Sequence, residues 1–268
     1  MGRYQQHYER RIPRNTLSTL IGGSIKMIAI KTENLTKKYK DVLAVDSLSL
    51  CIEEGELFSL LGINGAGKTT TVKMLSCLAE PTSGEAYLLG KSIKSESNEA
   101  KKLIAVSPQE TAVAKGLSAR ENLELICGAH GFTKEKRNEK IKEITDALGL
   151  KSVLNRKAGK LSGGWQRRLS IAMALISEPK ILFLDEPTLG LDVIARSELW
   201  DLIRTLKGKV TIILTTHYME EAEALSDRVA IMKDGRLLVC DTPAKIKEAA
   251  GTQSFEEAFV RIVKEGSR

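Results

Sequence analysis

The sequence lacks any apolar run approaching the roughly 18 residues that a membrane-spanning helix requires. Any role at a membrane therefore needs other subunits. The cysteines are few and far apart, with no C-x-x-C pair among Cys51, Cys77, Cys127 and Cys240. This spacing argues against a zinc site or a disulfide framework and suits a reducing cytosol. No internal repeat or low-complexity segment is present.

The distribution of charge gives little support to nucleic-acid binding. The net charge is +7, but five basic residues and a single acidic residue stand among the first 26. In the rest of the chain lysines and glutamates are interspersed, which is typical of a mixed, solvated surface. We therefore expect no nucleic-acid partner, while a weak attraction to anionic phospholipid stays open.

The first 26 residues differ from the rest of the chain. They show no periodicity, and their apolar piece, 17–25, is too short and too rich in glycine for a secretory signal. From Met27 to Glu33 apolar and polar residues alternate, which predicts an edge strand. We divide the chain into an extension, 1–26, and one domain, 27–268. The extension is either absent, with translation starting at Met27, or a short disordered basic tail.

The segment from Gly62 to Thr69 matches the phosphate-binding pattern G-x-x-x-x-G-K-[ST]. It follows a predicted apolar strand, 57–61, and opens a stretch with helical spacing, which is the context that this pattern requires. Its glycines let backbone N–H groups face an anion, and the helix N-terminus adds its dipole. Lys68 is expected to reach the β- and γ-phosphates and Thr69 to ligate Mg²⁺. The sequence therefore predicts a nucleoside triphosphate site formed by Gly62, Ile63, Asn64, Gly65, Ala66, Gly67, Lys68, Thr69 and Thr70.

Strands and helices alternate along the chain, which indicates an α/β fold. The continuous apolar runs 181–184 and 210–214 are typical of a parallel sheet covered on both faces. Another strand is predicted at 42–52, joined to the strand 57–61 by a hairpin turn. Between about 110 and 178 the pattern is helical, with helices expected near 119–131, 134–148 and 163–176. An α/β core with a mostly helical insertion follows.

Two carboxylates, Asp185 and Glu186, end the apolar strand at 181–184. They should emerge at the carboxyl edge of the sheet, where the phosphate-binding loop also lies. Asp185 fits a Mg²⁺ ligand, acting directly or through water, and Glu186 fits a general base for the attacking water. The alternative is an ordinary turn at the end of a strand.

The stretch Leu161-Ser162-Gly163-Gly164 stands ahead of Leu184-Asp185-Glu186-Pro187-Thr188. This order of motifs resembles the ATP-binding-cassette (ABC) ATPases, from about Met27 to the C-terminus, although Trp165 stands where the family commonly has Gln. The resemblance implies a P-loop NTPase core with a mainly parallel sheet and an N-terminal antiparallel β subdomain. It further implies an inserted α-helical subdomain, at about 110–178, and a C-terminal helical tail, at about 243–268.

The same resemblance assigns roles to other residues. It implies that two copies sandwich two ATP molecules, with the loop at 162–164 of one copy closing over the nucleotide of the other. It also implies that His217 contacts the γ-phosphate and that Gln109 ligates Mg²⁺ or its water at the hinge to the helical lobe. Nucleotide contacts from Ser162, Gly163 and Gly164, an interface position for Asp192 and stacking of Tyr39 on adenine complete the implied site.

The implied function is Mg·ATP hydrolysis by a homodimer or a pair of ABC subunits. These would lie peripherally at the cytoplasmic face of the membrane, against integral membrane permease subunits. The segments 242–245 and 254–259 resemble the ending of bacterial drug, antibiotic and sodium exporters, which favours export. The alternative is a soluble ABC ATPase, such as an iron–sulfur assembly ATPase. The short distance from Gln109 to Ser162 leaves no room for the coiled-coil insertion of chromosome-type members.

Overall fold

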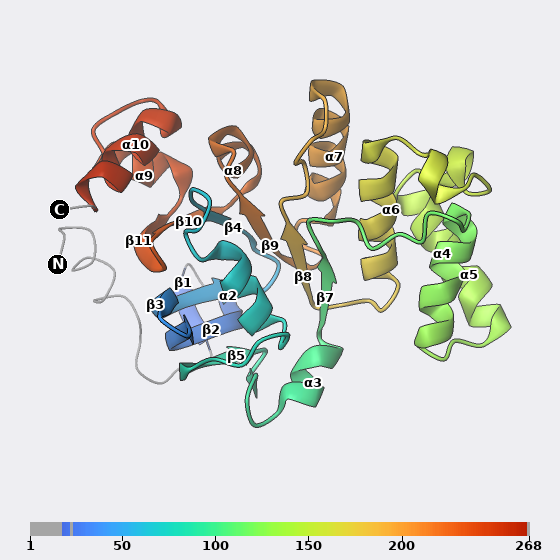
Figure 1. The fold of residues 1–268 in the computed structure, drawn as a ribbon, viewed down its shortest axis with the longest axis horizontal. Coiled ribbons are helices and arrows are strands. Elements are labelled where there is room, and N and C mark those ends of the chain that lie inside the picture. Colours follow the sequence, from blue (N-terminus) through green and yellow to red (C-terminus); the bar gives the residue numbers. More distant parts are fainter. Residues whose placement is uncertain (1–17, 22–23, 267–268) are drawn as a thin grey trace.

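The structure is a computed structural model that describes residues 18–21 and 24–266. Most of the extension proposed at 1–26 lies outside these residues, and a start at Met27 stays a prediction. Strand β1 (Ser18–Ile21) pairs antiparallel with the beginning of β2 (Ser24–Tyr39). The chain forms two sheets with helices packed around them (Figure 1).

The smaller sheet has five antiparallel strands with β2 at its centre. The strands besides β1 and β2 are β3 (Val42–Glu53), β5 (Ser83–Leu88) and β6 (Lys91–Ser92). Since β2 pairs with both β3 and β5, the edge strand predicted from Met27 to Glu33 is wrong. The alternation of apolar and polar residues indicates that one face of a strand is buried. It does not indicate whether the strand pairs with one other strand or with two.

The larger sheet has six strands in the order β11-β10-β4-β9-β8-β7, all parallel except β11. The hairpin predicted between 42–52 and 57–61 is wrong, because β3 and β4 belong to different sheets. The turn at Gly55, with φ of 74°, carries the chain from one sheet to the other. The strands are β4 (Leu57–Leu61), β7 (Ile104–Ser107), β8 (Ile181–Asp185), β9 (Thr211–Thr216), β10 (Arg228–Lys233) and β11 (Arg236–Asp241).

Alternate residues of the central strands enter two different cores. Phe183 and Ile213 pack in the core between this sheet and the smaller sheet. Leu182 and Leu214 pack on the opposite face, in the core that includes residues of the helical lobe. Because both faces are covered, every residue of β4, β8 and β9 is buried, and this explains why their sequences do not alternate between apolar and charged residues.

The helices divide into groups around the larger sheet. Figure 1 shows α4, α5 and α6 gathered at one end of the molecule, opposite α9 and α10. The expected insertion is therefore present between β7 and β8, and its three predicted helices agree with α4, α5 and α6 within two residues at each end. The short 3₁₀ turns are Lys151–Val153 and Ala158–Lys160. The helices are α2 (Lys68–Leu75), α3 (Ser97–Lys102), α4 (Ala119–Ala129), α5 (Lys134–Ala147), α6 (Gly163–Leu175), α7 (Val193–Leu206), α8 (Met219–Leu225), α9 (Pro243–Ala249) and α10 (Phe255–Glu265).

No helix in the described part of the chain combines the length and apolar composition needed to cross a bilayer.

The loop between β4 and α2 approaches the smaller sheet closely at one glycine. Gly67 has φ of 100°, and a Cβ added there would lie 2.5 Å from the carbonyl oxygen of Ala44 in β3. Gly65 has φ of 83°, yet a Cβ at that position would meet no atom within 4 Å. Both glycines supply a left-handed backbone, and only Gly67 is also needed for the contact that seats α2 against β3.

We predict that Gly67→Ala destabilises the protein more than Gly65→Ala. Each substitution places a Cβ in the left-handed region, at a cost of about 1–2 kcal/mol. Gly67→Ala adds a clash with rigid backbone, which costs about a further 1–3 kcal/mol. Urea denaturation of both variants without nucleotide measures the difference in the free energy of unfolding. Equal losses would show that the approach to Ala44 does not constrain the loop.

Candidate active site

A cleft of about 720 Å³ opens where the loop before α2 meets the carboxyl ends of the parallel strands. Parallel strands β4, β9 and β8 are neighbours, so their carboxyl ends lie at one edge of the sheet. The cleft brings together many of the residues predicted from the sequence. Those that line it are Asn64, Gly65, Ala66, Gly67, Lys68, Thr69, Thr70, Gln109, Glu186 and His217.

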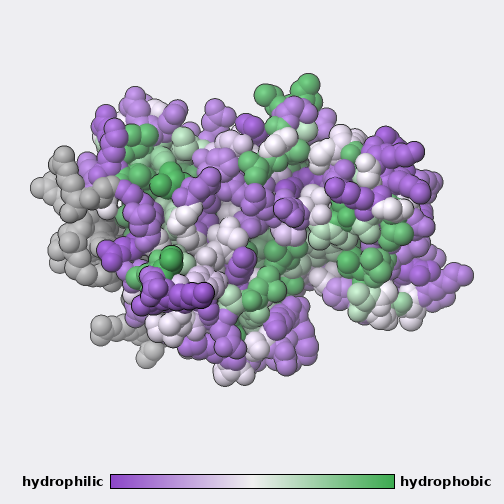
Figure 2. All heavy atoms as spheres, in the orientation of Figure 1, coloured by the Kyte–Doolittle hydropathy of each residue, from purple (hydrophilic) through white to green (hydrophobic). Residues whose placement is uncertain are grey.

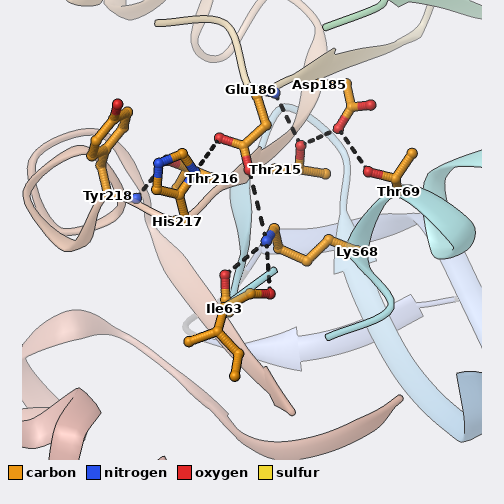
Figure 3. A network of polar contacts seen from close by, with 10 residues as sticks. Ile63, Lys68, Thr69, Asp185, Glu186, Thr215, Thr216, His217 and Tyr218 are labelled. Atoms are coloured by element: carbon orange, nitrogen blue, oxygen red, sulfur yellow. Dashed lines mark hydrogen bonds and ion pairs between the residues drawn. The ribbon is translucent and has the colours of Figure 1, made fainter. Parts of the chain in front are cut away.

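Lys68, the first residue of α2, is held at the base of this cleft. Its Nζ donates hydrogen bonds to the carbonyl oxygens of Gly62, at 2.7 Å, and Ile63, at 3.3 Å. The same ammonium lies 3.7 Å from Oε1 of Glu186 (Figure 3). Burial lowers the pKa of Lys68, and the Glu186 carboxylate opposes this shift. A partly desolvated cation of this kind attracts an anion more strongly than a solvated one.

Glu186 follows β8 with a left-handed backbone, at φ of 47°. Its N–H donates to both the carbonyl oxygen and the Oγ1 of Thr215, at 3.1 and 3.0 Å. Its Oε2 lies 2.8 Å from Nδ1 of His217, which follows β9. Residues other than glycine rarely adopt this backbone conformation. Where one does, the surrounding contacts hold the backbone in place. The carboxylate is thereby fixed between an imidazole and the Lys68 ammonium.

Asp185 and Thr69 form a second polar group beside Glu186 (Figure 3). Oγ1 of Thr69 lies 3.5 Å from Oδ1 of Asp185, which also accepts a hydrogen bond from the Thr215 hydroxyl. Hydroxyl and carboxylate oxygens are hard donors that suit Mg²⁺, which usually completes its shell with water and phosphate oxygens. The described residues contain no group of three or more His, Cys, Asp or Glu arranged to hold a metal.

Gln109 is placed by a contact that the sequence did not reveal. Arg167 of α6 is 5% exposed and donates to the carbonyl oxygens of Pro108, at 2.6 Å, and Gln109, at 2.5 Å. Its pKa is lowered by burial and raised in part by the nearby Asp185 and Glu221 carboxylates. Through these two hydrogen bonds the buried guanidinium holds the loop of Gln109 against α6.

Several predicted site residues lie outside the cleft. Ser162 precedes α6, and the two glycines that follow face Leu191, before α7, and Ala195, in its first turn. A Cβ at Gly164 would lie 3.1 Å from the Cβ of Ala195. Asp192 caps α7 by accepting a hydrogen bond from the N–H of Ala195, at 2.9 Å. Within one chain, therefore, Ser162, Gly163, Gly164 and Asp192 do not meet Lys68. Gly62 and Ile63 act through their carbonyl oxygens and do not line the cleft.

Tyr39, at the end of β2, is also absent from the cleft lining. Its ring is exposed, and the Lys37 ammonium lies 4.9 Å from the ring centroid. Its neighbour across the strand pair, Val42, does line the cleft. Tyr39 therefore stands beside the rim of the cleft, close to the exposed side chains of Val42 and Leu43, and its stacking on adenine stays a prediction.

The remaining lining residues were missed by the sequence analysis. They are Val42, Leu43, Ala44, Leu189 and Asp234. Val42 and Leu43 had a signal in the sequence, since two apolar residues directly follow the polar turn at 40–41. Thr215 had no such signal, because only its register opposite Asp185 in the sheet gives it a role.

Comparison with known proteins agrees with the geometry of the cleft. Residues 45–189, more than half of the chain, match the ABC transporter family. The probable multidrug ABC transporter ATP-binding protein YbhF of Escherichia coli is 36% identical over 257 residues, which are 94% of this chain and 44% of that protein. The chain thus spans less than half the length of YbhF.

Two further proteins are similar over most of the chain. The daunorubicin/doxorubicin resistance ATP-binding protein DrrA of Streptomyces peucetius is 38% identical over 225 residues, 84% of this chain and 68% of that protein. Among solved structures, the ATP-binding cassette MJ0796, in a dimeric post-hydrolysis state with ADP and Pi, superposes with a TM-score of 0.71. That match has 30% sequence identity and covers 80% of this chain and 98% of the other.

These matches include the phosphate-binding loop, the Ser162 motif and the strand-end carboxylates, so the resemblance inferred from the motifs is confirmed. The sheet, the helical insertion and the antiparallel subdomain agree with the fold of the solved relative. The chain therefore belongs to the ABC transporter family, as one of its ATPase domains.

Proposed function

We propose that this chain is the ATP-hydrolysing component of a bacterial ABC exporter. Two copies, or this chain and a paired ABC subunit, bind two Mg·ATP between them. They drive transport through separate membrane subunits from the cytoplasmic face. The observation that carries this proposal is the convergence of Lys68, Glu186 and His217 in one cleft from three separate elements. The drug-related names of YbhF and DrrA favour export.

The proposed chemistry follows from the contacts in the cleft. Lys68 and the backbone N–H groups of its loop bind the phosphates, while His217 orients the Glu186 carboxylate at 2.8 Å. Glu186 then positions the attacking water and accepts its proton. Thr69, Asp185 and Gln109 would hold Mg²⁺, which neutralises phosphate charge when it is bound.

The need for a second copy is supported by the surface around the cleft. Leu189, which lines the cleft, and Ile63, in the loop before α2, are exposed, and Val193 and Ile194 in the first turn of α7 are 78% and 73% exposed. Figure 2 shows apolar surface at the upper end of α7. Exposed apolar side chains of this kind mark a protein contact. In the proposed dimer, the Ser162 motif of one copy closes over the nucleotide of the other.

We predict that Glu186→Gln binds ATP but hydrolyses it about 10²–10⁴-fold more slowly, because the amide cannot accept the proton of water. The variant should accumulate as an ATP-dependent dimer. Phosphate release measures turnover, and size-exclusion chromatography with light scattering in Mg·ATP measures mass. Glu220→Gln, at an exposed position on α8, is the control with the same change of charge and should behave as wild type. Turnover like that of the wild type would remove Glu186 as the base.

Closure of the dimer should change the fluorescence of Trp165, which follows Gly164. In the Glu186→Gln background we expect ATP to shift this signal, and Trp165→Phe should abolish the response. Adding Lys68→Ala should also abolish it, because the loop then lacks the cation that binds the phosphates. If the fluorescence still changes in the variant that carries Lys68→Ala, the change does not depend on ATP bound at the Lys68 loop and the prediction is wrong.

The transport role predicts a membrane partner with about six apolar spans of about 20 residues. Expressed with such a neighbouring gene product, the tagged chain should co-purify with it in detergent and should sediment with membranes. Expressed alone, it should stay in the supernatant. A chain that never associates with such a protein would favour the alternative, a soluble ABC ATPase.

A further inference from the structure

The side chain after His217 links the active site to α7. The ring centroid of Tyr218 lies 4.2 Å from that of His217, with an angle of 40° between the planes. The guanidinium carbon of Arg196, in the first turn of α7, lies 4.8 Å from the Tyr218 ring centroid. Figure 3 shows Tyr218, His217 and Glu186 in succession. Arg196, Tyr218, His217 and Glu186 thus form a continuous chain of contacts.

A second contact joins the same two helices one turn further on. Nε1 of Trp200 donates a hydrogen bond to Oε1 of Glu221, at 3.0 Å, and Glu221 is fully buried. Arg196 and Trp200 are four residues apart and share one face of α7. Tyr218 and Glu221 are three residues apart at the start of α8. The beginning of α8 is therefore held by α7 at two points.

The contact with the Tyr218 ring gives the Arg196 guanidinium a partner on a side where it has no hydrogen bond. In the described part of the chain, Nε of Arg196 is buried without a hydrogen-bond partner, so the aromatic face supplies a favourable contact for the cation. The His217 side chain is 32% exposed, so part of it faces solvent and is not held by packing. The Tyr218 ring is the neighbour that limits how the exposed imidazole can move.

We propose that Arg196 and Tyr218 are positioning residues that hold His217 against Glu186. The inference rests on the proposed function, in which Glu186 is the base and His217 orients it. Neither Arg196 nor Tyr218 lines the cleft, so both act through His217. Their loss should impair the chemical step and leave the binding of ATP intact.

The test is steady-state ATP hydrolysis, with ATP affinity measured separately, for Tyr218→Leu and its control Tyr218→Phe. We expect Tyr218→Leu to lower kcat about tenfold or more through misplacement of His217. Its KM and its Kd for ATP should change less than about twofold, since the Lys68 loop is untouched. Tyr218→Phe keeps the aromatic face and should restore kcat. A wild-type kcat in Tyr218→Leu, or equal losses in both variants, overturns the proposal.

Arg196 supplies an independent pair of variants at a partly exposed position, should Tyr218→Leu fail to fold. Arg196→Met is expected to lower kcat, and Arg196→Lys, which keeps the cation, to recover much of it. The double variant Arg196→Met/Tyr218→Leu should be no slower than the slower single variant, because both remove one chain of contacts. Thermal denaturation of each variant establishes that it is folded. Losses that multiply in the double variant overturn the proposal.

Wild type and Glu186→Gln are measured in the same experiment. They separate the proposed role of Glu186 as the base from the proposed positioning role of Arg196 and Tyr218. If Glu186→Gln hydrolyses ATP like wild type, the proposed role of Glu186 fails and this inference fails with it. If Glu186→Gln is inactive while Tyr218→Leu and Arg196→Met keep the wild-type kcat, only the positioning role is overturned.

Discussion

The placement of the Glu186 carboxylate between the Lys68 ammonium and the His217 imidazole is the constraint on which the rest of the site depends. Glu186 and His217 directly follow the parallel strands β8 and β9, and Lys68 begins α2 after the loop that follows β4. The strand order β4-β9-β8 makes those ends neighbours at one edge of the sheet. Burial on both faces keeps this edge rigid, since every residue of the three strands is packed.

The parts of the site that follow from short segments could be predicted from the sequence. The loop at 62–69 and the acids Asp185 and Glu186 carry their chemistry within a few residues of an apolar strand. The helices of the insertion were predicted from their periodicity. By contrast, the pairing of β2 and the path from β3 to β4 depend on neighbours distant in sequence, and both were predicted wrongly. Thr215 was missed for the same reason, because its role arises from the register of β9 against β8.

The arrangement of the helical lobe bears on the proposal that a second copy completes the site. The glycines after Ser162 face Leu191, before α7, and Ala195, in its first turn, and they do not line the cleft. One turn further along α6, Arg167 donates to the main chain at Gln109, which does line the cleft. A single helix thus connects the cleft of its own chain with the motif proposed to serve a second copy. In the proposed dimer, α6 would link nucleotide binding to the contact between copies.

The backbone of Glu186 also bears on which substitutions the chain tolerates. A left-handed conformation costs a residue with a Cβ about 1–3 kcal/mol, and glycine adopts it without that cost. Glycine at position 186 would remove that backbone cost, but it would also remove the carboxylate that lies 3.7 Å from the buried Lys68 ammonium. The carboxylate thus offsets the strain of its own backbone through its contacts with Lys68 and His217, and the group proposed for the chemistry also contributes to the stability of the fold.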